Sequence, residues 1–575
     1  MYSDPLKIKI PACGTGSFPP GLPYENRIYN RVELTAELNI PDDKLSDDEI
    51  LRIGYGKYGN DIFNKVNGSF LFIHLDDGGN NLTLACGCEC TNTLFYRTNK
   101  NSITISPRLT TLLGFPGMPG DLDIRHIALV LSHIPLEPGN TCYRHIKRLP
   151  PGHLLTFNAS GVKIAPYWKT ENIKKVYHKN DADYIENFLE LYRHAVKTRI
   201  AGSDKIGISL SGGLDSETAA VLAAEELAKT NKQLYSYTSV PLYDSSPFTR
   251  VGRFGDESEY VRLLCRQYTN IIPKFLNMEN FSPLDGIIKS LDVLSQPLFA
   301  AANMFALHTL RAQAAEDHID TWMIGKGGNV TISFFGRENH SNGWADLARN
   351  FNYLRLFHEK DKFRMLIHIM VPEMIMDFVR SFRPPPPPRR NFSAINPALA
   401  EKLKITDIQP VEKTFREKKF ENYFRGTGAD FQGAAGIEYG LRTVDPTYDK
   451  KLLEFCFGIP DDQYRRYGIS RFLIRRAFNE KMPKTTIWNQ SRGRQSADLS
   501  LRVSAESGRA ENIIEKLNKS DAAREILDLE KMAAVLKRIQ TDHSPGIFSP
   551  TSNILLRGLM VGLFLLRHEG YKNRY

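Results

Sequence analysis

The chain has 575 residues, of which 42% are hydrophobic and 24% are charged, a composition that is typical of folded globular proteins and excludes disordered and fibrous classes. This length allows two to four domains, each large enough to bury its own core. The formal net charge of +10 favours a polyanionic ligand, but the basic residues form no single long tract of the kind expected for nucleic-acid binding.

The targeting and redox signals of the sequence favour a cytoplasmic protein. The first residues, MYSDPLKIKIPACG, contain no apolar core of a signal peptide. The apolar run at residues 558–566 is only half of a membrane span, so we expect a buried terminal helix and no membrane span. Seven dispersed cysteines, an odd number without the density of a disulfide scaffold, fit a reducing compartment.

A cluster of thiols occurs early in the chain, where CGCEC places Cys86, Cys88 and Cys90 at alternating positions. On a strand, this spacing turns alternate thiols to one face. The sequence offers no His/Cys quartet that would complete a metal site. We therefore favour a structural interpretation of these cysteines over a metal site.

The pattern of secondary structure changes near residue 180. Residues 1–170 contain short β-prone runs separated by Asn, Gly and Asp turns, which predict a strand-rich domain. Beyond it, apolar strands alternate with helical stretches; the strands are 205–210, 233–240 and 321–324, and the helices are 184–199, 217–229 and 257–268. This alternation predicts a doubly wound α/β domain over 180–575, with a mainly helical C-terminal part. The run RPPPPPRR at 383–390 must be extended, and we favour a stiff connector.

The motif SGGLDS at residues 211–216 lies between an apolar strand and an alanine-rich helix. Glycines at such a junction allow a tight turn, and the N–H groups that begin the helix favour an anion. The chain contains no Walker A motif. We therefore expect a serine-glycine cradle for the β,γ-phosphates of ATP and a magnesium ion on Asp215. That arrangement leaves the α-phosphorus open to attack by a carboxylate, and an amine can then displace AMP.

Several segments resemble the asparagine synthetase superfamily. SGGLDS is similar to its pyrophosphatase-type loop, and residues 58–77 and 139–157 resemble its glutaminase-like domain. Segments 322–336, 445–464 and 488–499 resemble its glycine-rich loop, the helix after its R-x-P-F-x-D-like motif, and its C-terminal lysine loop. The resemblance implies a degenerate, glutaminase-like (Ntn-type) β-sandwich at 1–170, followed by a doubly wound α/β ATP-pyrophosphatase domain at 180–575.

The same resemblance implies a set of ligand-binding residues. The residues expected to bind ATP are Leu210, Ser211, Gly212, Gly213, Leu214, Asp215, Ser216, Val240, Ile324 and Gly325. Mg²⁺ is expected on Asp215, with Asn329 standing where asparagine synthetases carry an acidic ligand.

The N-terminus departs from the glutamine-hydrolysing members of the family. Those enzymes need cysteine at position 2 as an N-terminal nucleophile, and this chain has Tyr2, whose phenol cannot serve. Cys13 is internal and would require an additional cleavage. We therefore expect no hydrolysis of glutamine.

Three motif variants resemble lasso peptide cyclases of the proteobacterial type: G-x-x-G-N-x-T-I-S at 325–333, D-P-T-x-D at 445–449 and R-G-x-Q-x-A-D at 492–498. This resemblance implies that a precursor peptide's Asp or Glu side chain is adenylated and then joined to the peptide's N-terminal amine. It also implies a leader peptidase and a leader-recognition protein as partners. Residues 336–436 are either a wall of the peptide pocket or a helical insertion that covers the sheet.

The acid–base residues follow the family pattern less closely. Ring-closing members keep a glutamate just before the R-x-P or R-D-P-T element, but here Glu438 lies two residues further upstream and Arg442 occupies the matching place. The lysine that stabilises the acyl-adenylate transition state has no clear equivalent. Arg492 is the nearest cation and could stabilise charge on the phosphate or the oxyanion.

Other functions remain open from the sequence. An ammonia-dependent asparagine synthetase or a β-lactam-closing synthetase would use the same chemistry on a small substrate. A nucleotide-binding pseudo-enzyme is disfavoured by the intact loop, and a tRNA-modifying relative is disfavoured because no C-x-x-C pair is present. The basic residues that accumulate at 465–494 are either a solvated helix face or, in part, a pyrophosphate site.

Overall fold

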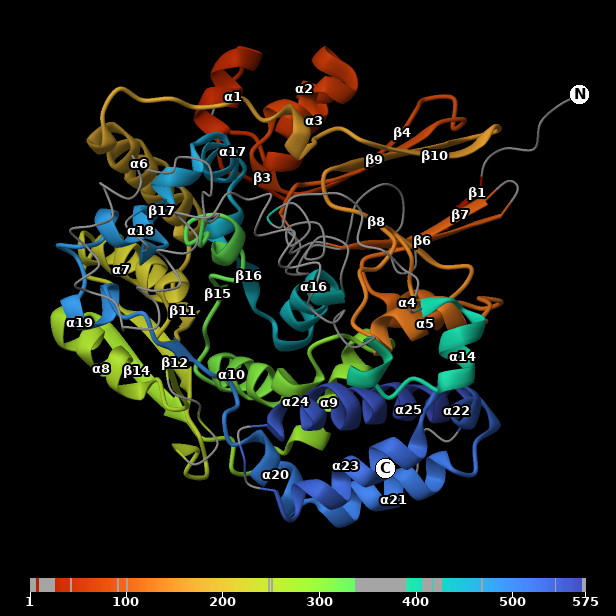
Figure 1. Ribbon diagram of the computed structural model, residues 1–575. Coiled ribbons are helices and arrows are strands. Elements are labelled where there is room, and N and C mark those ends of the chain that lie inside the picture. Colours follow the sequence, from red (N-terminus) through yellow and green to blue (C-terminus); the bar gives the residue numbers. More distant parts are fainter. Residues whose placement is uncertain are drawn as a thin grey trace, which may run out of the picture.

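The computed structural model describes most of the chain (Figure 1). The described residues are 7–9, 26–41, 44–89, 93–99, 102–246, 249, 252–336, 389–405, 416, 427–466, 469–542, 544 and 546–570. Tyr2, Cys13, Cys90, the proline run 384–388 and most of the 336–436 region lie outside them, so the expectations for these residues stay predictions.

The N-terminal part is a sandwich of two β-sheets, as expected. Among the described residues, one sheet has the order β1-β7-β6-β8 and the other β10-β9-β5-β4. The strands are β1 Lys7–Lys9, β4 Leu71–Leu75, β5 Leu82–Cys86, β6 Leu94–Asn99, β7 Ser102–Ser106, β8 Lys147–Leu149, β9 His153–Asn158 and β10 Gly161–Pro166. Alternating apolar side chains from both sheets, such as Leu84, Ile103 and Leu155, form one buried cluster.

Helices and short strands flank this sandwich on two sides. On one side, α4 Leu109–Leu113 and α5 Ile124–Leu131 join a large core formed with residues of the second part of the chain. On the other side lie β2 Arg27–Ile28, α1 Arg31–Leu38, α2 Asp47–Tyr58, α3 Ile62–Lys65 and β3 Gly68–Ser69. A second core forms where Leu34, Ile50 and Phe63 of these helices meet Phe72 and Ala85 of the sheet. Cys86 and Cys88 are buried, and burial raises the pKa of the Cys88 thiol to about 11. Cys86 belongs to the core between the two sheets, and the sulfur of Cys88 lies 3.8 Å from the hydroxyl of Tyr167.

A parallel sheet follows in the second part of the chain. Among the described residues it contains β11 Ile206–Ser209, β12 Leu234–Ser239, β14 Ile271–Leu276, β15 Thr321–Met323 and β16 Arg442–Val444. The four pairings between these strands are all parallel. The three predicted strands match β11, β12 and β15 to within one residue at each end. The edge strands β14 and β16 were not predicted.

Helices pack on both faces of the parallel sheet, which confirms the doubly wound fold. Trp322 on one face joins a core with α9 Pro283–Leu294, α10 Met304–Glu316 and α16 Thr427–Tyr439. The adjacent residue Met323 joins the core of the other face. That face carries α6 Asp181–Ile200, α7 Leu214–Ala228, α8 Ser258–Gln267, α17 Lys450–Gly458 and α18 Phe472–Ala477. Trp322 and Met323 are neighbours on β15, and their side chains therefore pack against helices on opposite faces of the sheet.

The C-terminal residues form a group of helices, drawn in blue at the bottom of Figure 1. They are α20 Leu499–Ala505, α21 Ser507–Leu517, α22 Asp521–Ile526, α23 Leu529–Ile539, α24 Phe548–Pro550 and α25 Arg557–His568. Residues 548–568 are long and apolar enough to cross a membrane, but 78% of the apolar window is buried inside the protein. Every residue of the run 558–566 is buried in α25, which confirms the expected terminal core helix.

Buried ion pairs join the two parts of the chain. Arg199 of α6 is 0% exposed and contacts Glu89 of the N-terminal part as well as Asp449, whose Oδ2 lies 3.0 Å from the guanidinium. Asn67 of the N-terminal part donates to the same Asp449 oxygen at 2.8 Å. The carboxylate of Asp449 therefore binds groups from both parts.

We expect Arg199→Ala to destabilise the protein by about 3–5 kcal/mol, because it leaves two buried carboxylates without their cation. Urea unfolding of the full chain measures this effect. The control is Lys484→Ala, which removes an exposed pair with Glu480 (N–O distance 2.8 Å) and should change stability by about 1 kcal/mol or less. Equal effects of the two variants would contradict the assigned role of Arg199.

Candidate nucleotide site

The parallel sheet reverses its winding between β11 and β15. The strands have the spatial order β14-β12-β11-β15-β16. The chain first adds β12 and β14 on one side of β11, and it then adds β15 and β16 on the other side. Open α/β sheets bind ligands outside the carboxyl ends of their strands at such a point. The SGGLDS loop follows β11 and the 325–329 loop follows β15. Both predicted ligand loops therefore lie at the position where the topology favours a ligand.

Hydrogen bonds between two serines shape the SGGLDS loop. The Ser216 hydroxyl accepts from the Ser211 N–H at 3.1 Å and lies 2.9 Å from the Ser211 hydroxyl. The Ser211 hydroxyl in turn accepts from the N–H of Gly213 at 3.3 Å. Helix α7 begins at Leu214, and within the described residues its N-terminus has no side-chain cap. The loop thus holds a helix N-terminus whose N–H groups and dipole favour an anion.

The glycines of the 325–328 loop allow it to pack directly on Asp215. A Cβ built on Gly328 would lie 2.3 Å from Asp215 Cγ, and one built on Gly325 would lie 2.9 Å from the Asp215 carbonyl oxygen. Any larger side chain at either position would displace Asp215. Gly325, one of the residues expected to bind ATP, borders Asp215 in this way.

Asp445 fixes the shape of the same glycine loop. Its carboxylate accepts hydrogen bonds from the N–H groups of Lys326 and Gly327 at 3.0 and 3.1 Å, and from Thr447. Burial raises the pKa of Asp445 to about 6, although these donors favour the ionised form. Asp445 therefore positions the loop that contacts Asp215.

A cavity opens at the carboxyl ends of β11 and β12. Three residues predicted to bind ATP, Leu210, Ser211 and Val240, lie in its wall. The other lining residues come from the ends of β11 and β12, the start of α8, α10 and the segment before and within α20: Ser209, Ser239, Pro241, Gly255, Glu257, Asn303, Phe305, Ala306, Leu307, Leu310, Arg494, Gln495, Ser496, Ala497, Asp498 and Arg502. The cavity has a volume of about 80 Å³, and polar and apolar residues contribute about equally to its wall.

Arg492 lies beside this region in a group of three arginines. Its strand β19, Arg492–Gly493, pairs in parallel with β13, Arg253–Phe254. Burial, followed by the charges of Arg471 and Arg253, lowers the pKa of Arg492. A polyanion would relieve the repulsion among these guanidinium groups. The stabilisation of negative charge by Arg492 stays a prediction, and an arginine cannot act as a base at neutral pH.

The other basic residues of the 465–494 run have structural partners. These include Arg466 with Asp181 and Asp462, Arg475 with the carbonyl of Ser470, Lys481 with Glu225, and Lys484 with Glu480. These partners give the four residues structural roles, and the pyrophosphate interpretation stays a prediction for the rest of the run. Arg471 and Arg492 are the members that belong to the arginine group beside the loop.

The expected magnesium ligands differ in their surroundings. Asp215 offers a carboxylate next to the loop, and one carboxylate together with substrate phosphates is a common way to hold Mg²⁺. The side-chain oxygen of Asn329 accepts a hydrogen bond from Arg471 at 3.1 Å. Within the described residues, no group of three or more His, Cys, Asp and Glu side chains could form a metal cage. Asp215 therefore fits a magnesium ion that is held jointly by its carboxylate and the phosphates of a nucleotide.

Glu438 lies at the end of α16, away from the cavity wall. Its two carboxylate oxygens contact Lys289 of α9 at 2.6 Å and Arg108 of the N-terminal part at 3.4 Å. Two cations therefore surround the carboxylate predicted as an acid–base residue. Its contacts link the two parts of the chain, and the structure does not bring it to the cavity.

Several polar contacts that shape the site were not predicted, although Gln495 and Asp498 belong to the motif at 492–498. Asp498 accepts from the N–H of Leu242 at 2.7 Å and from Arg502 at 2.8 Å, which holds the segment after β19 against β12. Asn303 contacts the side chains of Gln495 and Ser496 at 3.0 and 3.1 Å. The contacts made by Leu242 and Asn303 join segments 192 to 256 positions apart, so their partners could not be predicted from local sequence.

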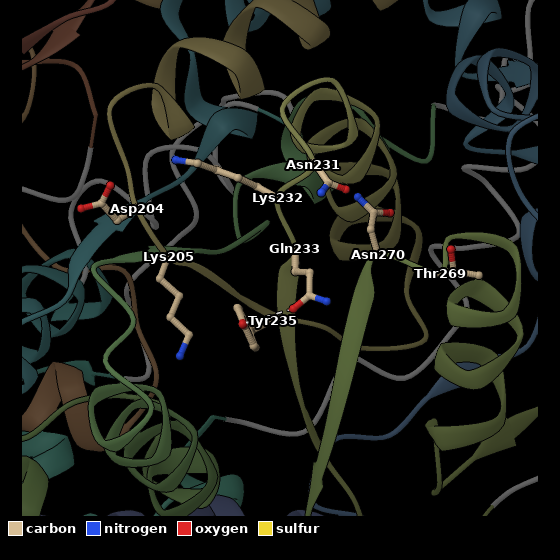
Figure 2. A pocket seen from close by; sticks show the side chains of 8 residues that line it. All are labelled: Asp204, Lys205, Asn231, Lys232, Gln233, Tyr235, Thr269 and Asn270. Atoms are coloured by element: carbon tan, nitrogen blue, oxygen red, sulfur yellow. Dashed lines mark hydrogen bonds between the residues drawn. The ribbon is translucent and has the colours of Figure 1, made fainter.

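A second concavity of about 490 Å³ lies at the opposite edge of the sheet (Figure 2). Its lining includes Lys205 and Lys232, and both ammonium groups already donate to main-chain oxygens, those of Asp317 and Ser203, at 2.6 and 2.9 Å. This edge carries the amino ends of β11, β12 and β14. It is therefore a weaker candidate for the ligand site.

Comparisons with known proteins agree with this architecture. A family model described as "Glutamine amidotransferase domain" matches residues 19–168, and one described as "Asparagine synthase" matches residues 187–380 and 435–556. Glutamine-hydrolyzing asparagine synthetase 3 of Bacillus subtilis is 27% identical over 220 residues, which cover 37% of this chain and 36% of that protein.

Two further relatives match at similar identity over stretches of different length. Glutamine-hydrolyzing asparagine synthetase 2 of Bacillus subtilis is 24% identical over 355 residues, 57% of this chain and 45% of that protein. A glutamine-hydrolyzing asparagine synthetase of Zea mays is 28% identical over 207 residues, 35% of this chain and 30% of that protein. The chain thus spans between about a third and a half of the length of the curated relatives it matches.

Proposed function

Since the chain belongs to the asparagine synthase family of ATP-dependent, amide-forming enzymes, we propose that it is a macrolactam-forming lasso peptide cyclase. The substrate is a ribosomally made precursor peptide, from which a partner peptidase removes the leader after a recognition protein binds it. The enzyme joins an Asp or Glu side chain to the peptide's N-terminal amine by an isopeptide bond. We place this reaction in the cytoplasm.

The observation that carries the proposal is the SGGLDS loop at the topological switch point, beside an arginine group. The N–H groups of Gly212 and Gly213 and the N-terminus of α7 would hold the β,γ-phosphates. Asp215 would hold the Mg²⁺ that accompanies ATP and neutralises phosphate charge. The peptide carboxylate then attacks the α-phosphorus, forming an acyl adenylate and releasing pyrophosphate.

Ring closure completes the reaction. The unprotonated N-terminal amine attacks the acyl carbon, and the C–O bond to AMP breaks, so that the peptide loses one water overall. Arg492 is suited to stabilise the oxyanion or the leaving phosphate. A site that holds both ends of the peptide together supplies proximity worth about 7–11 kcal/mol in a well-oriented case.

The choice of a peptide over a small substrate rests on sequence variants in the site. Asn329 replaces an acidic residue, and its contact with Arg471 joins the glycine loop to the arginine group. The D-P-T segment fixes that loop through Asp445. These segments are the ones that resemble lasso peptide cyclases.

A leaderless peptide with a free amine and an internal Asp or Glu tests the proposal. With ATP and Mg²⁺, we expect mass spectrometry to show the loss of one water, with AMP and pyrophosphate as products. Acetylation of the amine should stop ring closure while still allowing adenylation of the carboxylate. Replacing the acceptor by Asn or Gln should stop both steps, because a neutral amide is a poor nucleophile toward phosphorus.

An ammonia-dependent asparagine synthetase is the second candidate, because the curated relatives carry the name asparagine synthetase. A β-lactam-closing synthetase is a related alternative that would also act on a small substrate. Conversion of free aspartate and ammonia, with such peptides left untouched, would refute the cyclase. Formation of ADP in place of AMP would refute both the cyclase and the asparagine synthetase.

We expect glutamine to be no source of ammonia for this enzyme. Tyr2 stands where the family's glutaminases need a nucleophilic cysteine, so incubation with glutamine and ATP should release no glutamate. A coupled glutamate assay on the purified chain makes this measurement. Release of glutamate at an enzyme-like rate would show that another residue serves as the nucleophile.

A further inference from the structure

Tyr260 of α8 packs against the SGGLDS loop. A Cβ built on Gly212, the first glycine of this loop, would lie 3.1 Å from Tyr260 Cβ and 3.3 Å from its Cδ2. Any side chain at position 212 would therefore press against the tyrosine. Because glycine has no side chain, the ring can lie directly on the backbone of the loop, just before α7 begins.

The same ring contacts the strand pair that carries Arg492. Its centroid lies 4.8 Å from that of Phe254 in β13, and the two ring planes meet at 38°. Phe254 pairs with Gly493 of β19, and its carbonyl accepts a hydrogen bond from the Arg494 N–H at 2.9 Å. One side chain thus contacts both the SGGLDS loop and the β13–β19 pair.

The hydroxyl of Tyr260 contacts the segment that leads into β19. It accepts a hydrogen bond from the side-chain amide of Asn489 at 2.9 Å. The main-chain oxygen of Asn489 accepts from the buried Arg475 at 3.0 Å, and its side-chain oxygen accepts from the Ser491 N–H at 2.8 Å. Helices α8 and α18 therefore both hold Asn489, three residues before Arg492.

We propose that Tyr260 is a positioning residue that holds Arg492 at a fixed place relative to the SGGLDS loop. This role rests on the proposed AMP-forming reaction, in which Arg492 stabilises charge on the oxyanion or the leaving phosphate. A cation stabilises a transition state only where charge develops, and a displacement of about 1 Å can reduce a rate by about 10²-fold. Tyr260 therefore acts through Arg492 and takes no part in the bond-forming steps.

A double-mutant cycle between Tyr260→Phe and Arg492→Ala tests this role. The measurement is AMP formation from radiolabelled ATP at saturating peptide and Mg²⁺. Tyr260→Phe keeps the ring on Gly212 and Phe254 and removes the contact with Asn489. We expect kcat to fall about tenfold, whereas KM for ATP should change by less than about twofold. In the Arg492→Ala background the same change should lower kcat by less than about twofold, because no guanidinium remains to be positioned.

Tyr268→Phe is the matched control at the other end of α8. The Tyr268 hydroxyl donates to the main-chain oxygen of Lys481 at 2.9 Å, so this variant also loses one tyrosine hydrogen bond. It should leave kcat unchanged in both backgrounds. Asn489→Ala removes the partner of the Tyr260 hydroxyl and should lower kcat in the same way. It makes the measurement if Tyr260→Phe does not fold.

Equal losses from Tyr260→Phe with and without the Arg492 guanidinium would show a structural role alone and overturn the proposal. An unchanged kcat of the folded single variant would also overturn it. A wild-type chain that forms AMP neither with a peptide nor with aspartate and ammonia would refute the proposed function, and the positioning role with it. Additive effects in a wild type that does form AMP refute only the role of Tyr260.

Discussion

Asp215→Asn is expected to lower the rate of AMP formation by about a thousandfold, because the amide removes the charge that would hold Mg²⁺ at the α-phosphorus. A loss of this size corresponds to about 4 kcal/mol of transition-state stabilisation. The measurement is AMP and pyrophosphate release at saturating peptide, ATP and Mg²⁺. Circular dichroism and the melting temperature should show an intact fold.

The matched control for this variant is Asp204→Asn. Asp204 is exposed at the opposite edge of the same sheet, beside the concavity drawn in Figure 2. It should leave the rate of AMP formation unchanged. Near-normal activity of Asp215→Asn, or an unfolded protein, would reassign Asp215 to a structural role.

Gly328→Ala should lower activity by about a hundredfold or more without changing any ionisable group. The new methyl group would lie 2.3 Å from Asp215 Cγ and 2.7 Å from its Cβ, so the Asp215 side chain must rotate away. A displacement of about 1 Å in a catalytic arrangement can reduce a rate by about 10²-fold. Rates measured over a range of Mg²⁺ concentrations would show whether the loss of activity comes from weaker binding of Mg²⁺.

Gly508→Ala provides the control for the added methyl group. A Cβ at this position in α21 meets no atom within 4 Å, so activity should be unchanged and stability should change by about 1 kcal/mol or less. If Gly328→Ala retained full activity, the packing of the glycine loop on Asp215 would have no catalytic importance.

The part of the fold that the sequence predicts well is encoded locally. The strands β11, β12 and β15 have buried apolar patterns, and α7 has an apolar helical repeat. β14 was missed because Pro273 and Lys274 interrupt its apolar residues and only Ile271 is fully buried. β16 is three residues long, and only Val444 is buried. Such strands are defined by their neighbours in the sheet and not by their own composition.

The candidate site likewise has a part that is encoded locally and a part that depends on distant segments. SGGLDS is a contiguous motif, so its place after β11 could be predicted, although its binding of ATP stays a prediction. The surroundings of Glu438 could not be predicted, because Lys289 and Arg108 reach it from distant segments. The contact of Arg471 with Asn329 joins residues 142 positions apart for the same reason. The loop is encoded by contiguous residues, whereas tertiary packing brings the surrounding side chains to it from distant segments.

The buried ion pairs between the two parts of the chain bear on how the enzyme can be dissected. Asp430 of α16 pairs with Arg148 of the sandwich at 2.8 Å, just as Arg199 of α6 pairs with Glu89. A truncated protein without the first 170 residues would expose Arg199 and Asp430 without these partners. The sandwich therefore serves as an internal scaffold for the synthetase, and we expect the full chain to melt in a single cooperative transition.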